Sequence, residues 1–126
     1  PLHYAALLGH TEIVKELIKA GALTSTADEL GWTPLHKAAE AGHTSTVVAL
    51  LAAGAKKDVT NEEGSTPLHY AAREGCSDVV SALIIAGVTL NAPDKQGRTS
   101  LHHAAYCGHA EVALALMRSG AEVNHR

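Results

Sequence analysis

The sequence predicts an all-α repeat solenoid, and two observations support this fold class. The first is a period of 33 residues that runs through the 126-residue chain without insertion or deletion. The second is the composition, because hydrophobic residues make up 46% of the chain, aromatic residues only 3%, and phenylalanine is absent. The apolar side chains are mainly Ala, Leu and Val, which suit closely packed helices better than a thick sheet core. The period is marked by a proline or serine before each Leu-His pair, at Pro1, Pro34, Pro67 and Ser100.

Each period is predicted to form two short helices and a turn. Thr33 is a typical N-cap residue, and Pro34 suits the first helical position, where the N–H that proline lacks has no intrahelical partner. Gly42 then ends the first helix, because a left-handed residue is favoured at that point. The second helix is clearest in residues 11–21, TEIVKELIKAG, where apolar residues at helical spacing form one face and a glycine ends the run.

Polar segments that contain a glycine separate the helix pairs: ADELGWT, NEEGST and DKQGRT. One helix pair cannot cover its own apolar faces, so such units are stable only when they stack. The chain begins inside one motif and ends where another turn would start, so we expect a segment of a longer array or of a larger protein. We predict four units, the first without a preceding turn, at residues 1–27, 28–60, 61–93 and 94–126.

These motifs resemble the ankyrin repeat family. The family pattern is D-x-x-G-x-T-P-L-H-x-A-A-x-x-G-H, followed by a Val/Leu helix and G-A-D-V-N-A, and GWTPLHKAAEAGH, DKQGRTSLHHAAYCGH and GAEVN match it. The resemblance covers essentially the whole chain and implies L-shaped units with antiparallel helices and projecting β-hairpin turns. It also implies protein recognition through the hairpin tips and the concave face of the first helices. Ser100 in place of proline and Cys76 in place of histidine indicate a natural array rather than a consensus design.

The histidine of each Leu-His pair is predicted to be structural. It lies in the first turn of a helix, where an imidazole can bond to the cap hydroxyl and to the backbone of an adjacent unit. A zinc site needs three or four ligands that converge at ~2 Å, whereas equivalent atoms of stacked helices lie ~10 Å apart. We therefore expect no metal and no other cofactor at His3, His36, His69 and His102. We expect turn positions for His10, His43 and His109, and surface positions for His103 and His125.

Catalysis is a second possibility that the histidines raise. Cys107 lies close in sequence to His102, His103 and His109, and a thiol–imidazole pair could supply a nucleophile and its base. Nothing in the sequence indicates an oxyanion hole, and no glycine-rich phosphate loop is present. We predict that the protein is not an enzyme, and a histidine-based metal-binding or enzymatic protein is kept as the alternative.

The overall composition excludes some classes of partner. With 10 Lys and Arg against 13 Asp and Glu the net charge is −3, which implies no general attraction to nucleic acid. No apolar run approaches the ~20 residues that span a bilayer, so we expect no membrane insertion. Two cysteines are too few for a disulfide framework and favour an intracellular setting, in the cytoplasm or nucleus.

Function is then expected from residues that the repeat does not require. We predict a non-catalytic protein–protein interaction module, a scaffold or adaptor that is monomeric as an isolated array, and a passive structural spacer is a further alternative. The resemblance places the candidate contact residues on turn tips and first helices. They are Glu29, Leu30, Trp32, Lys37, Glu40, Glu62, Glu63, Ser65, Tyr70, Arg73, Glu74, Lys95, Gln96, Arg98, His103 and Tyr106.

Trp32 is the only tryptophan, in a turn position where the other units have Ser65 and Arg98. An exposed indole beside Leu30 would be an interface anchor; the alternative is that Trp32 folds over its own turn. Leu7 and Leu8 are either groove contacts or residues covered by a preceding unit.

The charges of the candidate residues are graded along the chain. Glutamates gather in the two middle units, while Lys95 and Arg98 make the last unit more basic, so we expect a partner with a basic middle and an acidic end. A solvated rim without a partner is the alternative.

In the family, an asparagine that ends a Leu-x5-[Asp/Glu]-Val-Asn run can be β-hydroxylated. The resemblance extends this to Asn124, and the alternative is that Asn124 bonds only within its turn.

Overall fold

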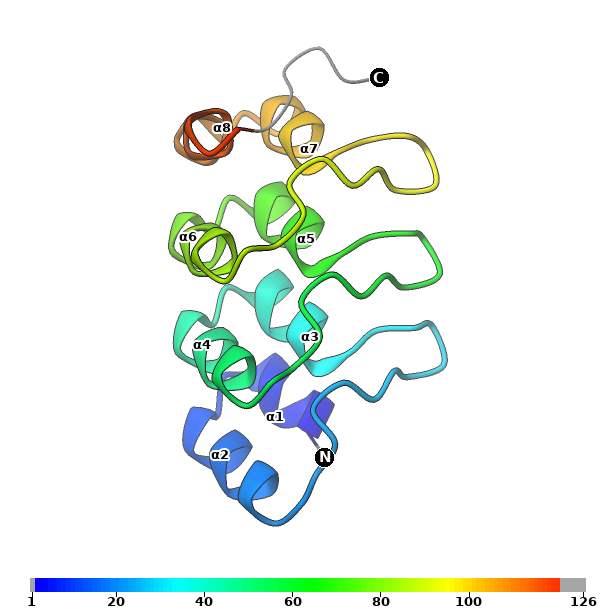
Figure 1. Ribbon diagram of the computed structural model, residues 1–126, viewed down its shortest axis with the longest axis vertical. Helices are drawn as coiled ribbons and strands as arrows, with labels where there is room; N and C mark the ends of the chain where they lie inside the picture. The colour runs from blue at the N-terminus through cyan, green and yellow to red at the C-terminus, as the bar shows by residue number, and fades with distance from the viewer. Residues whose placement is uncertain (1, 121–126) are drawn as a thin grey trace.

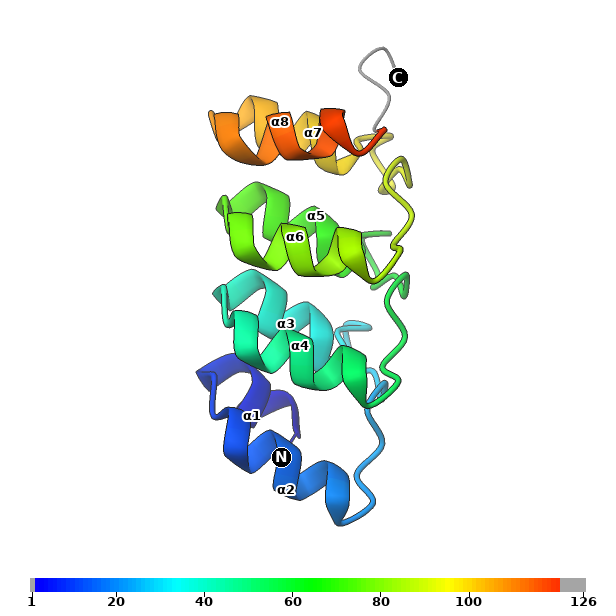
Figure 2. The ribbon, with the colours of Figure 1, turned by 60° about the vertical axis from the view of Figure 1, so that its left-hand side comes forward.

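The computed structural model describes residues 2–120, and this part of the chain contains eight α-helices in two layers (Figure 1). The odd-numbered helices form one layer and the even-numbered helices the other, and successive pairs stack along the long axis of the molecule (Figure 2). The predicted all-helical repeat solenoid is confirmed. The helices are α1 (Leu2–Leu8), α2 (Thr11–Lys19), α3 (Pro34–Ala41), α4 (Thr44–Ala52), α5 (Pro67–Glu74), α6 (Ser77–Ile85), α7 (Ser100–Tyr106) and α8 (Ala110–Arg118).

The connections between helix pairs project to one side of the stack as loops (Figure 1). No β-strand occurs within residues 2–120, so the expected β-hairpins are not found as paired strands. Two backbone bonds close the tip of each loop; in the first, the N–H of Asp28 donates to the carbonyl of Trp32 at 2.8 Å and the N–H of Gly31 donates to the carbonyl of Asp28 at 3.0 Å. Neighbouring loops are also joined, because the N–H of Glu62 donates to the carbonyl of Leu30 at 3.0 Å.

The predicted helix start at Thr33 and helix end at Gly42 are confirmed in α3, whereas α7 has Cys107 rather than a glycine as its C-cap. The side chain of Thr33 accepts a hydrogen bond from the backbone N–H of His36, and the His36 ring accepts one from the N–H of Thr33, which forms a capping box. The same box recurs at the starts of α5 and α7. Gly42 follows α3 with φ +77°, the left-handed conformation that glycine adopts without strain.

The core lies between the two helix layers. The alanine pairs of α1, α3 and α5 are buried, as is Ala104 of α7, and Ala38 and Ala39 have no exposed surface, so neighbouring first helices can approach closely. The largest fully buried side chains are leucines, one in each of five helices and repeated at the 33-residue period. They are Leu35, Leu50, Leu68, Leu83 and Leu116.

A second set of contacts between units lies at the turns within the helix pairs, on the side of the stack opposite the loops. Nε2 of His43 donates to the carbonyl oxygen of Leu7 in the preceding unit at 3.0 Å, and its ring packs against Gly9. His109 makes the same contact with the carbonyl of Arg73 at 2.9 Å. Two of the three histidines expected to be turn residues, His43 and His109, therefore also connect units, at the N-caps of α4 and α8.

Candidate protein-binding surface

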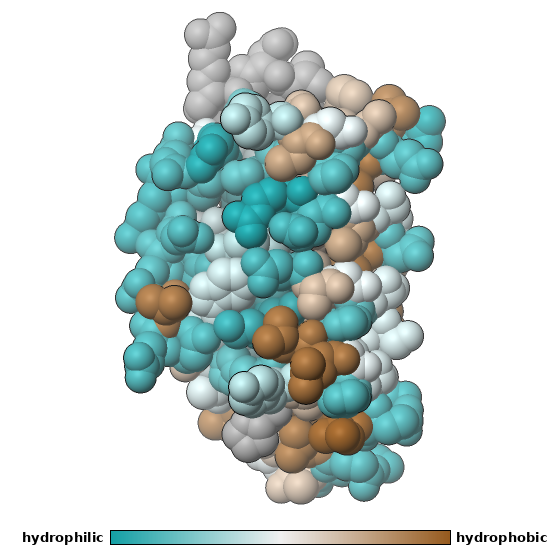
Figure 3. All heavy atoms as spheres, turned by 180° about the vertical axis from the view of Figure 1, so that it is seen from behind, coloured by the Kyte–Doolittle hydropathy of each residue, from teal (hydrophilic) through white to brown (hydrophobic). Residues whose placement is uncertain are grey.

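The first helices and the loops border two clefts on the same side of the molecule. In the view from behind, apolar surface gathers in the lower half and hydrophilic surface predominates in the upper half (Figure 3). We call the hollow between α1 and the first loop the lower cleft; it has a volume of about 410 Å³ and is lined by His3, Tyr4, Leu7, Asp28 and Lys37. The upper cleft, of about 290 Å³, is lined by Glu62, Glu63, Ser65, Arg73, Asp94, Lys95, Gln96, Arg98 and His103.

Between the clefts, aromatic rings and cations from two units form one stack. The rings of Trp32 and Tyr70 are stacked with centroids 4.4 Å apart and an interplanar angle of 30°. Nζ of Lys37 lies 4.8 Å from the centroid of the indole, and the Arg73 guanidinium lies 4.9 Å from that of the Tyr70 ring. Both are cation–π geometries, so the two stacked rings are flanked by a cation on each side.

This stack corrects the expectation of an exposed Trp32. The indole is half-buried because it lies on a tyrosine of the next unit, rather than standing free or folding over its own turn. Tyr70 was a candidate contact residue but is 2% exposed. Its hydroxyl donates to Oε1 of Glu63 at 2.8 Å and accepts from Nδ2 of Asn61 at 2.7 Å. Burial raises the pKa of Tyr70, so the phenol remains neutral.

The charges beside the stack are paired. Nζ of Lys37 lies 3.4 Å from a carboxylate oxygen of Asp28, and Arg73 contacts Glu40 at 3.3 Å. Burial opposes ionisation of Asp28, but hydrogen bonds from the N–H groups of Trp32 and Leu30, together with Lys37, lower its pKa below the ordinary value. The carboxylate thus stays ionised and holds the tip of the first loop.

Asp94 clamps the last loop in the same way. Its Oδ1 accepts bonds from the N–H groups of Gln96 and Arg98, both at 2.9 Å, and its Oδ2 accepts one from Nε2 of His103 at 3.0 Å. Although burial acts to raise the pKa of Asp94, these donors lower it. The surface position expected for His103 is wrong, since its side chain is only 13% exposed and its ring packs edge-on against His69 at 5.5 Å.

The expectation that equivalent histidines stay apart did not consider His103, which lies close to His69. His69, Asp94 and His103 place possible ligand atoms within 4.8 Å of one another, because positions 69 and 103 are not equivalent in the repeat. However, Nδ1 of His69 accepts the N–H of Thr66 at 2.9 Å, and its Nε2 donates to the carbonyl of Arg98 at 3.0 Å. Both ring nitrogens are hydrogen-bonded to backbone groups, so His69 could coordinate a metal ion only if the N-terminal cap of α5 were broken.

A family profile described as ankyrin repeats (3 copies) matches residues 1–61 and 42–126. The chain belongs to the ankyrin repeat family. A comparison with curated proteins gave no match. No helix within residues 2–120 of this ankyrin repeat chain is long and apolar enough to cross a membrane.

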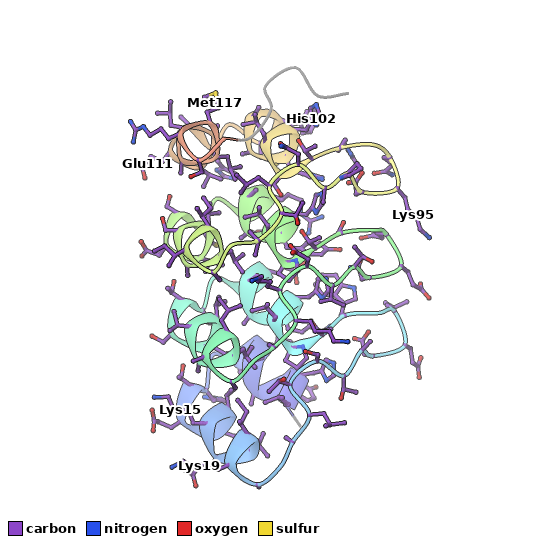
Figure 4. The ribbon with its side chains drawn as sticks, in the orientation of Figure 1. Lys15, Lys19, Lys95, His102, Glu111 and Met117 are labelled. Atoms are coloured by element: carbon purple, nitrogen blue, oxygen red, sulfur yellow. The ribbon has the colours of Figure 1, made fainter. Side chains whose placement is uncertain are left out.

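The remaining candidate residues of the ankyrin repeat chain fall into three groups by burial. Ser65 is buried, and its carbonyl accepts a bond from His36. Asn124 lies outside the described residues. The half-buried candidates are Trp32, Lys37, Glu40, Arg73 and His103. The exposed candidates are Glu29, Leu30, Glu62, Glu63, Glu74, Lys95, Gln96, Arg98 and Tyr106. Figure 4 shows Lys95 projecting from the tip of its loop.

Sequence reasoning missed the residues that hold the loops in shape. Asp28, Asn61 and Asp94 accept backbone bonds two and four residues ahead, which are Asx-turn contacts. The signal was present, because each stands three residues before the loop glycine and matches the Asp of the family pattern at two of the three sites.

Proposed function

We propose that this chain is a non-catalytic module that binds a protein partner through its first helices and loop tips. The observation that carries the proposal is that both clefts open on this side and are lined mostly by residues that the repeat does not fix. Ankyrin repeats are generally protein–protein interaction modules. A groove whose side chains vary while its scaffold repeats can acquire a specific partner without changing the fold.

The groove is preorganised, which favours a binding role over that of a passive spacer. The loops are joined at their tips by the bond from Glu62 N–H to Leu30 and by one from Lys95 N–H to Glu63, each 3.0 Å long. The cation–aromatic stack fixes the floor between the clefts. A surface that is already ordered loses less conformational entropy when a partner binds.

The histidines and cysteines support a structural rather than a catalytic role. Burial lowers the pKa of His36 and His69, and the ring nitrogens of both are bonded to cap and loop backbone. Burial raises the pKa of the Cys76 thiol, which disfavours the nucleophilic thiolate. Both cysteines are free, which is compatible with the intracellular setting and monomeric state that we propose.

Site-specific photocrosslinking tests the proposal. A benzophenone amino acid is placed at Glu62 or Lys95 on the loop tips, and at Ser45 on α4 as the control, since all three side chains are exposed. The three proteins are expressed in the cells of origin and irradiated. We expect covalent adducts with one partner protein from the two loop positions only. Absence of adducts, or equal adducts from Ser45, would contradict the proposed surface.

A further inference from the structure

The apolar residues Tyr4, Leu7 and Leu8 are not explained by stacking between units. Their equivalents 33 residues later include Glu40 and Ala41 in α3, which packs against first helices on both sides. Even so, the Glu40 side chain remains 33% exposed and Ala41 is exposed. These helix positions therefore stay exposed to solvent even when another unit lies beside them.

In α1 these positions are occupied by the apolar side chains of Tyr4, Leu7 and Leu8. Tyr4 is 70% exposed and Leu8 is 55% exposed, and Tyr4 and Leu7 form one wall of the lower cleft. Leu30, which is 57% exposed, adds apolar surface at the tip of the first loop. The corresponding positions of α3 and α5 carry paired charges such as Glu40 and Arg73, so the repeat itself does not require apolar residues here.

Negative charge without a partner lies next to this apolar surface. Asp28 and Glu40 are each paired with a cation, whereas Glu29 and Glu62 are exposed on adjoining loop tips. Within residues 2–120, neither of these two glutamates has a cation within 4.0 Å. Unpaired charge at the rim of an apolar cleft favours a partner that brings the opposite charge.

We infer that the lower cleft binds an apolar side chain of a partner segment that also carries lysine or arginine. This inference rests on the proposed function and adds the chemistry of the partner. The apolar side chain lies against Tyr4 and Leu7, where it is removed from water. The neighbouring cations face Glu29 and Glu62 on the loop tips, where they set the orientation of the segment and its rate of association.

Selection from a library of random short peptides displayed on phage, with the intact chain as bait, tests this chemistry directly. We expect enriched sequences that combine Leu, Met, Phe or Trp with a nearby Lys or Arg. One enriched peptide is then synthesised, and its Kd is measured by fluorescence anisotropy at several salt concentrations.

Two pairs of variants separate the apolar and charged parts of the site. Tyr4→Ser should weaken the peptide by about tenfold or more, while its control Ile85→Ser, at a side chain 86% exposed on α6, should not change Kd. Glu29→Gln combined with Glu62→Gln should weaken binding at low salt and flatten the salt dependence. The control Glu111→Gln, on α8 away from the loops (Figure 4), should do neither.

The outcomes distinguish this inference from the proposed function. Enriched peptides without the apolar–basic pattern, or a Kd unchanged by Tyr4→Ser, would overturn the inference. If Lys95→Gln or Arg98→Gln still raises the Kd of those peptides, the groove binds peptides and the proposed function stands. If no groove variant changes the Kd of the selected peptides, neither the inference nor the proposed function is supported. Circular dichroism of each variant shows that its fold is retained.

Discussion

Nε2 of His36 lies 2.9 Å from the carbonyl oxygen of Ser65, in the loop of the following unit. Nδ1 of the same ring accepts the N–H of Thr33 at 3.0 Å, so the ring proton resides on Nε2, which donates to Ser65. His69 repeats this arrangement with Thr66 and Arg98. One neutral imidazole thus completes a helix cap and joins two units, as predicted for the histidines of the Leu-His pairs.

Acidification should destabilise the array through these rings. Burial lowers the pKa of His36 and His69 below that of an unfolded-chain histidine, about 6.5. The unfolded state therefore binds more protons, and the free energy of unfolding decreases as pH falls below about 6.5. Urea denaturation between neutral and mildly acidic pH measures this as a falling midpoint.

The control for this prediction is the double variant His36→Gln, His69→Gln. Glutamine at this position keeps an acceptor for the N-cap N–H but does not titrate. The variant should be less stable at neutral pH and should show a shallower pH dependence. An unchanged pH dependence would assign the effect to other histidines among the nine in the chain.

Replacing Cys76 by histidine should stabilise the array. His43 and His109 occupy the equivalent position and donate to a carbonyl of the preceding unit, whereas the Cys76 thiol cannot reproduce that bond. A new bond from the imidazole to the Glu40 carbonyl should add about 1 kcal/mol to the free energy of unfolding. Cys76→Ser, which cannot reach across, is the matched control, and equal stability of the two variants would disprove the explanation.

Gly75→Ala should destabilise the array more than Gly108→Ala. Both glycines end first helices with similar angles, φ +75° and +77°. A Cβ at Gly75 would lie 2.5 Å from Nδ1 of His109, whereas one at Gly108 would meet no described atom within 4 Å. The backbone strain of about 1 kcal/mol is common to both. Thermal unfolding should show a larger loss for Gly75→Ala, and equal losses would mean that the histidine ring moves aside freely.

Trp32→Ala should lower stability, rather than act only on partner binding as the sequence suggested. The indole packs on Tyr70, and such ring pairs contribute about 1 kcal/mol beyond the area they bury. A double-mutant cycle of Trp32→Ala with Tyr70→Leu should give a coupling of that size. Tyr106→Leu is the control, because Tyr106 is 91% exposed and should show no coupling.

The repeat and its helix ends could be predicted because they depend on local chemistry. Thr33, Pro34 and Gly42 each favour one backbone conformation at one position, and the 33-residue period shows that the same choice recurs. The bonds of the Leu-His histidines were also predictable, since their cap partner is only three residues away. These features hold whatever the rest of the chain does.

The candidate surface was harder to predict because it depends on contacts between units. Trp32 and Tyr70 are far apart in sequence, and only the stacking of units brings one ring onto the other. His103 was placed on the surface because position 103 varies, but Asp94 in the preceding loop draws it inward. A list of variable positions therefore includes side chains that the stack buries, as it does Tyr70 and Ser65.

The bonds that join neighbouring loops and the histidines that join neighbouring helix pairs also bear on how the molecule responds to force. Each is a separate, weak fastening between adjacent units, as in Glu62 to Leu30 and His43 to Leu7. A pull on the ends of the described stack puts the same force on every such contact, and the contacts should break one at a time, so the chain should lengthen in steps and re-form from whichever units remain intact. We therefore expect a stepwise and reversible extension.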